Sequence, residues 1–195
     1  MTFEWGYLFG MALQTVPEPR KIAREVQSLD LPRPVLWQIL ALLLVASTFL
    51  GVLSGLLYPV SAEELGPVLG NPIVNGITEA SFTVLTVFAI YWIGGALGGT
   101  GTFDQALLTV IWLQFLLLIV ELGVVTLGLF APGLAVLLWV MGLVLAFWVL
   151  SHFIAEMHGF RSAGSVFAGI LMLLLVMAVA MSALFMAIGL AAPAI

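Results

Sequence analysis

Five long apolar stretches constrain this chain more than any other feature of its sequence. A bilayer core of about 30 Å needs roughly 20 apolar residues in helix, because every backbone amide must find its partner within the segment. The apolar runs are continuous and show no alternation of the kind that a membrane β-barrel needs. The sequence therefore predicts an all-α integral membrane protein, a bundle of five transmembrane helices with spans at about 35–57, 77–97, 104–130, 132–154 and 163–190.

The charge content also indicates a chain that meets lipid rather than water. Only 8% of the residues are charged and 63% are hydrophobic, against about 25% and 45–50% in an ordinary soluble domain. This composition excludes a soluble enzyme and a disordered tail, and the lack of cysteine in the sequence excludes a disulfide-stapled module. The net charge of −5 argues against a nucleic-acid partner, which needs a basic surface.

The basic residues predict the orientation of the chain. Four of the five precede the first span, and the fifth lies between spans four and five. Both places lie on the same side of a five-span protein, and basic residues favour the cytoplasmic side. We therefore expect a cytoplasmic N-terminus and a C-terminus on the opposite side. The residues expected to contact lipid headgroups are Arg20, Lys21, Arg24, Arg33 and Arg161.

Residues 1–34 are too few for a domain with its own core, and they precede a membrane domain at 35–195. Pro19 suits a first helical turn, and an apolar face follows at helical spacing, formed by Ile22, Ala23, Val26 and Leu29. We expect a short interfacial amphipathic helix lying against anionic lipid headgroups, with a solvated linker as the alternative. The stretch 3–13, which contains several aromatic residues, is expected at the interface as well.

Glu121 is the ionisable residue expected deepest in the membrane, within the third span. A charge there costs about 2.5–3.5 kcal/mol on insertion scales, so such residues often carry function. Glu121 suits a proton carrier or a cation ligand. The structural alternative, which we favour, is a neutral carboxyl group bonded to another helix through Thr83, Thr86 or Ser182, since the spans contain no basic residue to pair with it.

Two further acidic residues have simpler explanations. Glu79 begins the predicted second span, where the helix dipole favours an acidic side chain. Asp104 opens the third span, with Thr102 or Asp104 itself as the N-cap. Both are expected to be structural before they are functional.

A polar cluster ends the fourth span, formed by His152, Glu156 and His158. His152 and Glu156 are four residues apart and share a helix face, a pairing that can hold zinc. The metalloprotease spacing is absent and three ligands would have to come from one helix end. We therefore favour anchoring of the helix in the headgroup region, with Glu156 and Arg161 partly neutralising each other, over a metal site.

A glycine-rich run follows the second span but lacks the lysine and the preceding strand of a phosphate-binding loop. Small residues four apart let helices approach closely. This spacing predicts helix packing at Gly94, Gly95, Gly98 and Gly99, and at Gly51 and Gly55 in the first span. Packing within the bundle is also expected for the methionines of the last span, Met172, Met177, Met181 and Met186.

Several motifs resemble the Yip domain family (Ypt- and Rab-interacting membrane proteins) in its bacterial branch. The sequence PRK at Pro19–Lys21 and LDLPR at Leu29–Arg33 resemble the segment before the first span. The run GGALGGTGTFDQA at Gly94–Ala106 resembles the glycine turn and third-span start of these domains. The run AEMHGFRS at Ala155–Ser162 resembles their fourth-to-fifth loop. The resemblance extends over about residues 20–190.

This resemblance implies a protein without catalytic residues or cofactors, because the family has none established. Eukaryotic members act in vesicle trafficking and membrane shaping and engage prenylated small GTPases. The long cytoplasmic region associated with that work is reduced here to residues 1–34, so we do not expect a GTPase partner. We expect instead a bacterial inner-membrane protein, with its C-terminus periplasmic, that organises lipid, self-associates, or serves other membrane proteins as a scaffold or accessory subunit.

Two other functions stay open from the sequence. A transporter or channel component would use Glu121 in a proton or cation path. A membrane enzyme would hold a metal ion at the cluster of His152, Glu156 and His158, although the chain offers no convincing nucleophile or base for it.

Overall fold

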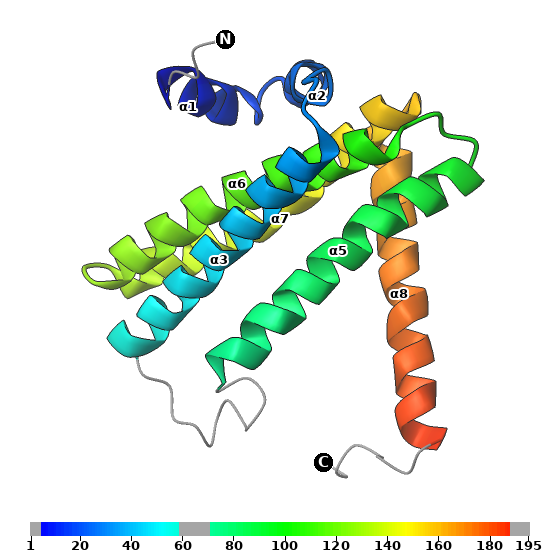
Figure 1. Ribbon diagram of the computed structural model, residues 1–195. Helices are drawn as coiled ribbons and strands as arrows, with labels where there is room; N and C mark the ends of the chain where they lie inside the picture. Colours follow the sequence, from blue (N-terminus) through cyan, green and yellow to red (C-terminus); the bar gives the residue numbers. More distant parts are fainter. Residues whose placement is uncertain (1–4, 59–70, 188–195) are drawn as a thin grey trace.

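The computed structural model describes residues 5–58 and 71–187, and within those ranges every regular element is a helix. Five helices are long and apolar enough to cross a membrane. They are α3 (Arg33–Leu57), α5 (Pro72–Ala96), α6 (Phe103–Gly128), α7 (Pro132–His158) and α8 (Ala163–Ala187). Two short helices, α1 (Trp5–Gln14) and α2 (Pro19–Gln27), precede them (Figure 1). The predicted fold class is confirmed.

The ends of the spans follow from their caps. The Thr102 hydroxyl accepts from the Gln105 amide and the Gln105 side chain accepts from the Thr102 amide, a capping box that starts α6 as expected. The predicted start of the second span was wrong. Asn71 caps α5 and Pro72 occupies its first turn, so Glu79 lies about two turns inside the helix and does not begin it. Positions 188–190 of the fifth predicted span lie outside the described residues.

Helix α6 is the centre of the bundle and packs against α3, α5 and α7. Its contact with α7 is close because glycines face side chains across it. A Cβ atom at Gly142 of α7 would lie 2.8 Å from Val120, and one at Gly123 of α6 would lie 2.8 Å from Leu138. The close contact between α6 and α7 therefore uses glycines other than those that the four-residue spacing singled out.

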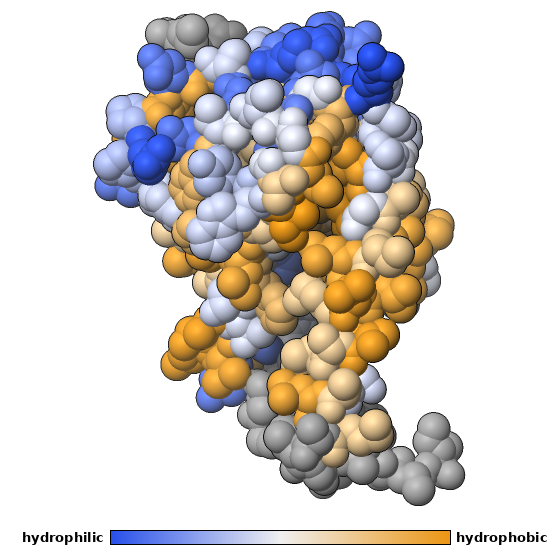
Figure 2. All heavy atoms as spheres, turned by 90° about the vertical axis from the view of Figure 1, so that its right-hand side faces the viewer, coloured by the Kyte–Doolittle hydropathy of each residue, from blue (hydrophilic) through white to orange (hydrophobic). Residues whose placement is uncertain are grey.

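The last helix diverges from the others (Figure 1). Near its start it packs on α7, where the rings of Phe147 and Phe167 meet edge to face at 5.9 Å. None of the residues in its most apolar stretch is buried. The methionines of this helix are exposed, so the prediction that they pack within the bundle was wrong for the chain by itself. Figure 2 shows the result as a broad apolar surface below a hydrophilic end.

The predicted amphipathic helix is present as α2, and its apolar face is the expected one. Ile22, Ala23 and Val26 are almost completely buried. The neighbour of that face differs from the expectation, because α2 packs against α6 and α7. Protein, not lipid, therefore covers the apolar side of α2, and its charged side faces outward.

Candidate functional site at the charged end of the bundle

All five basic residues of the chain lie at one end of the bundle, where α3 and α6 begin and α7 ends. We call this region the charged end. Arg33 and Asp104 join the first turns of α3 and α6 through two bonds, Nε to Oδ1 at 2.7 Å and Nη2 to Oδ2 at 3.2 Å. The Arg33 guanidinium also lies 5.4 Å from the centre of the Phe103 ring. This bidentate geometry fixes the two helix starts relative to each other.

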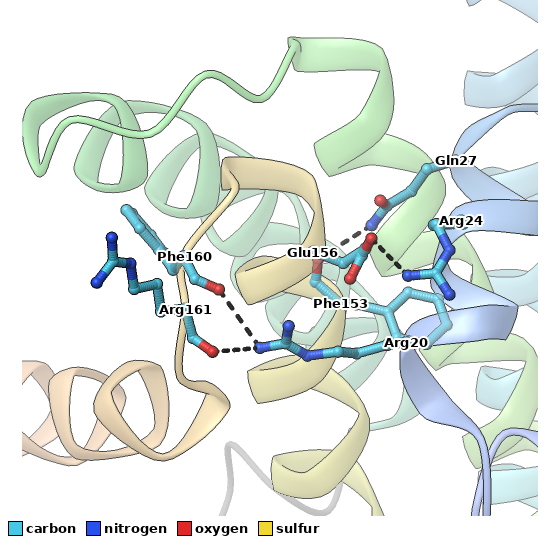
Figure 3. A network of polar contacts seen from close by, with 7 residues as sticks. All are labelled: Arg20, Arg24, Gln27, Phe153, Glu156, Phe160 and Arg161. Atoms are coloured by element: carbon cyan, nitrogen blue, oxygen red, sulfur yellow. Dashed lines mark hydrogen bonds and ion pairs between the residues drawn. The ribbon is translucent and has the colours of Figure 1, made fainter.

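Helix α2 is held across the charged end by polar bonds from one side of the helix (Figure 3). Arg24 Nη1 lies 2.9 Å from Glu156 Oε1. Arg20 Nη2 donates to the carbonyl oxygens of Phe160 at 3.3 Å and Arg161 at 3.0 Å. These bonds connect α2 to the end of α7 and to the turn before α8.

Gln27 makes the buried polar contact of α2. Its Nε2 atom donates to Thr109 Oγ1 of α6 at 3.0 Å and to the Phe153 carbonyl oxygen of α7 at 3.1 Å. Gln27 and Thr109 are both buried. Because an unsatisfied buried polar group costs about 1–3 kcal/mol, these bonds matter more to the docking of α2 than the exposed ion pairs.

Two basic residues have partners or directions that the sequence did not predict. Glu156 pairs with Arg24 and not with Arg161, whose guanidinium points away from the network in Figure 3. Lys21 pairs with Glu18, the residue before α2, at 2.8 Å between Nζ and Oε2. That hydrogen bond, together with the negative charge of Glu18, raises the pKa of Lys21. The headgroup contacts of all five basic residues stay predictions.

His158 lies buried where α7 ends, inside the turn between α5 and α6. Its Nδ1 atom is 3.2 Å from the Gly101 amide nitrogen, and its Nε2 atom is 3.0 Å from the Ile90 carbonyl oxygen. The amide can only donate and the carbonyl can only accept. The imidazole is therefore neutral and carries its proton on Nε2.

The glycines of this turn make room for the His158 ring. A Cβ atom at Gly94 would overlap Nε2, and one at Gly99 would overlap Nδ1. A Cβ at Gly101 would lie 2.5 Å from Met157. Gly98 has a φ of +89°, which a side chain would strain. Gly94 and Gly99 were predicted to bring two helices together, whereas in the structure they enclose a histidine.

The other predicted packing glycines have few neighbours among the described residues. A Cβ atom added at Gly55 or at Gly95 would meet no atom within 4 Å, and at Gly51 the nearest would be Glu121 Oε1 at 4.0 Å. Their role in contacts with a further helix stays a prediction.

The three polar residues that end α7 do not converge. The His152 ring lies 4.2 Å from the Trp148 ring, and its Nδ1 atom is 2.8 Å from the Trp148 carbonyl oxygen. Glu156 turns to Arg24, and His158 turns into the glycine turn. In the described part of the chain, no group of three or more His, Asp or Glu residues could hold a metal ion.

Glu121 lies in the other half of α6, partly buried between helices. Ser47 Oγ of α3 donates to Glu121 Oε2 at 2.9 Å. The expected partner was therefore wrong: Thr83 Oγ1 accepts from Gln114 at 3.1 Å, and Thr86 donates to its own helix. Ser182 is exposed on α8. Glu79 of α5 is close enough to interact electrostatically with Glu121.

The comparisons with known proteins identify the family of the chain. The family model of the Yip1 domain matches residues 13–184, which includes α2, the glycine turn and all five long helices up to the last turn of α8. Neither a curated protein nor a solved structure matches the chain. Because the match extends over most of the sequence, the chain belongs to the Yip1 domain family.

Proposed function

We propose that this protein is a non-enzymatic membrane organiser, which acts as a scaffold or accessory subunit through the apolar faces of its helices. The observation that carries the proposal is the exposure of α8. None of the residues in its most apolar stretch is buried, whereas 44% of the corresponding stretch in α6 is buried. A helix that packs on the rest of the chain only near its start offers most of its length to lipid or to another membrane protein.

The chemistry of the charged end supports the same proposal. Arg20, Arg24 and Gln27 bind backbone carbonyls or side chains of the chain itself, and Arg33 binds Asp104. Such groups hold the helices in place, because each of them is bonded to another part of the chain. An organiser needs this kind of rigid end more than it needs a reactive group.

Cross-linking from α8 tests the proposal. A photoreactive amino acid replaces Met177, which is 48% exposed on α8, and the matched control carries it at Asp30, which is exposed next to α2. In native membranes we expect Met177 to capture a second copy or a single membrane protein in defined stoichiometry, and Asp30 to capture neither. Equal and scattered products from both positions would contradict the proposal.

We also propose a bacterial inner-membrane location with the charged end in the cytoplasm. Its support is the gathering of all five basic residues at one end, since basic residues are retained on the cytoplasmic side. A C-terminal alkaline phosphatase fusion should then be active and a C-terminal green fluorescent protein fusion dark. An inactive phosphatase fusion together with a bright green fluorescent protein fusion would instead place the C-terminus in the cytoplasm and the charged end on the opposite side.

Glu121 supports a second candidate function, proton or cation transport. Ser47 and Glu121 form a polar pair within the membrane-spanning part, with Glu79 near it on α5. Glu121→Gln keeps the shape of the side chain and removes its ability to carry a proton or bind a cation. In proteoliposomes under a pH gradient, loss of flux in Glu121→Gln but not in Gln114→Glu would favour transport. Equal flux in both variants and in the native chain would contradict transport through Glu121 and favour the organiser role.

A further inference from the structure

Helix α1 has an apolar face that the rest of the described chain leaves uncovered. The helix contains no charged residue. Tyr7, Phe9 and Leu13 are 60%, 50% and 78% exposed, and Val16 directly after the helix is 54% exposed. Met11 and Thr15, on the side opposite Phe9, Leu13 and Val16, are buried. The helix therefore has a docked side and a free apolar side.

Two contacts with α6 determine where α1 lies along that helix, one from the buried Thr15 and one from an edge of the half-exposed Phe9 ring. Trp112 Nε1 of α6 donates to Thr15 Oγ1 at 3.1 Å, and the rings of Phe9 and Phe115 lie 6.5 Å apart. Trp112 and Phe115 come about nine and twelve positions after the start of α6, which is roughly 13–18 Å along its axis. In Figure 1, α1 accordingly lies beside the middle of α6, and α2 lies nearer its charged end.

A further contact places the following turn below the charged residues of α2. Trp148 Nε1 of α7 donates to the Val16 carbonyl oxygen at 3.2 Å, so a backbone group at this depth is satisfied by protein. Tyr7 behaves as an interfacial residue does, since its ring is exposed and its hydroxyl donates to Glu25 of α2 at 3.5 Å. The Tyr7 hydroxyl thus points toward α2 at the charged end.

We propose that α1 is embedded in the leaflet at the charged end, where the face formed by Phe9, Leu13 and Val16 contacts phospholipid acyl chains. Acyl chains are the occupant because α1 contacts the membrane-spanning helix α6 and carries no charge. A helix of this length adds about 15 Å by 10 Å of protein to one leaflet.

This inference deepens the proposed function, because any ordering of lipid by α1 rests on the organiser role. The depth of α1 does not rest on it. A measurement of depth can therefore contradict the embedding of α1 while cross-linking from α8 supports the organiser role. The opposite pair of results is equally possible.

The sequence contains no cysteine, so single cysteines report on single positions without further engineering. Nitroxide labels are placed on α1 at Leu13→Cys and just after it at Val16→Cys. Asp30→Cys is the water-exposed control. Val144→Cys is the control within a span, where the native side chain is 65% exposed. Power saturation with oxygen and with a water-soluble nickel chelate is measured in phosphatidylethanolamine and phosphatidylglycerol vesicles.

Embedding predicts that labels at 13 and 16 collide with oxygen several-fold more often than with the nickel chelate, as the label at 144 does, and that the label at 30 shows the opposite ratio. Labels at 13 and 16 that match position 30 would overturn the inference and place α1 in water. Labels shielded from both reagents would also overturn it, because a protein surface would then cover the face. All four positions are exposed, so labelling is not expected to disturb the fold.

Discussion

Arg24 and Glu156 lie 132 positions apart in the sequence and join α2 to the end of α7, with 2.9 Å between Nη1 and Oε1. The two side chains differ in burial, since Arg24 is 62% exposed and Glu156 is 18% exposed. The cost of breaking the pair therefore depends on which partner is removed. Removal of Arg24 leaves a mostly buried carboxylate, whereas removal of Glu156 leaves a guanidinium that water can reach.

We predict that Arg24→Ala lowers the free energy of unfolding by about 1 kcal/mol and that Glu156→Gln lowers it by less. The double variant should recover part of the loss. Thermal unfolding in detergent micelles measures all three. Lys21→Ala is the control, because its partner Glu18 is only three residues away, at the N-cap of α2, and both side chains are half exposed. An equal loss in Lys21→Ala would mean that the Arg24 effect is nonspecific.

Gln27→Ala should destabilise the chain more than Arg24→Ala. It removes two bonds and leaves the buried Thr109 hydroxyl without its partner on α2, at a cost of about 1–3 kcal/mol. The matched control is Gln14→Ala, since Gln14 is exposed at the end of α1. If Gln27→Ala unfolds like the native chain, α2 is not held by this contact.

Substitution of the turn glycines should separate those that enclose His158 from those that do not. Gly94→Ala and Gly99→Ala force a methyl group into the imidazole and should cost about 1–3 kcal/mol. Gly95→Ala meets no atom within 4 Å and lies inside α5, so it should be neutral or stabilise by up to about 1 kcal/mol. Unfolding transitions of the three variants that cannot be distinguished would contradict the arrangement around His158.

The tautomer of His158 is a direct spectroscopic prediction. Nitrogen-15 spectra of histidine-labelled protein near neutral pH should show one ring with its proton on Nε2 and an unprotonated Nδ1, because the Gly101 amide donates to Nδ1. His152→Gln removes the other histidine and assigns the signal. A His158 signal with the proton on Nδ1 would be incompatible with both hydrogen bonds.

The features that could be predicted from the sequence are those with a local cause. The apolar face of α2 follows from the spacing of Ile22, Ala23 and Val26, and the start of α6 follows from the short-range capping box of Thr102 and Gln105. What covers the α2 face could not be predicted, because an apolar stripe packs equally well on lipid or on two helices. The start of α5 was missed although Asn71 and Pro72 together form a recognisable start signal.

The polar partners depend on how helices are arranged, which the sequence does not reveal. Glu121 needed a hydrogen bond from another helix, and hydroxyl residues on several helices could have supplied it before α3 was placed beside α6. Gln27 gave no signal of its own, because a glutamine at the end of a short amphipathic helix is usually solvated. The enclosure of His158 by Gly94 and Gly99 likewise requires the α5–α6 turn to meet the end of α7.

The central claim, that this protein organises other membrane components and does not act alone, is tested most directly by extracting it with its surrounding lipid in a polymer nanodisc. Native mass spectrometry then reads the mass of the intact assembly. The account predicts a discrete assembly of several copies, or of one copy with a stoichiometric membrane partner, that keeps anionic lipid. A monomer without partner or retained lipid would contradict it.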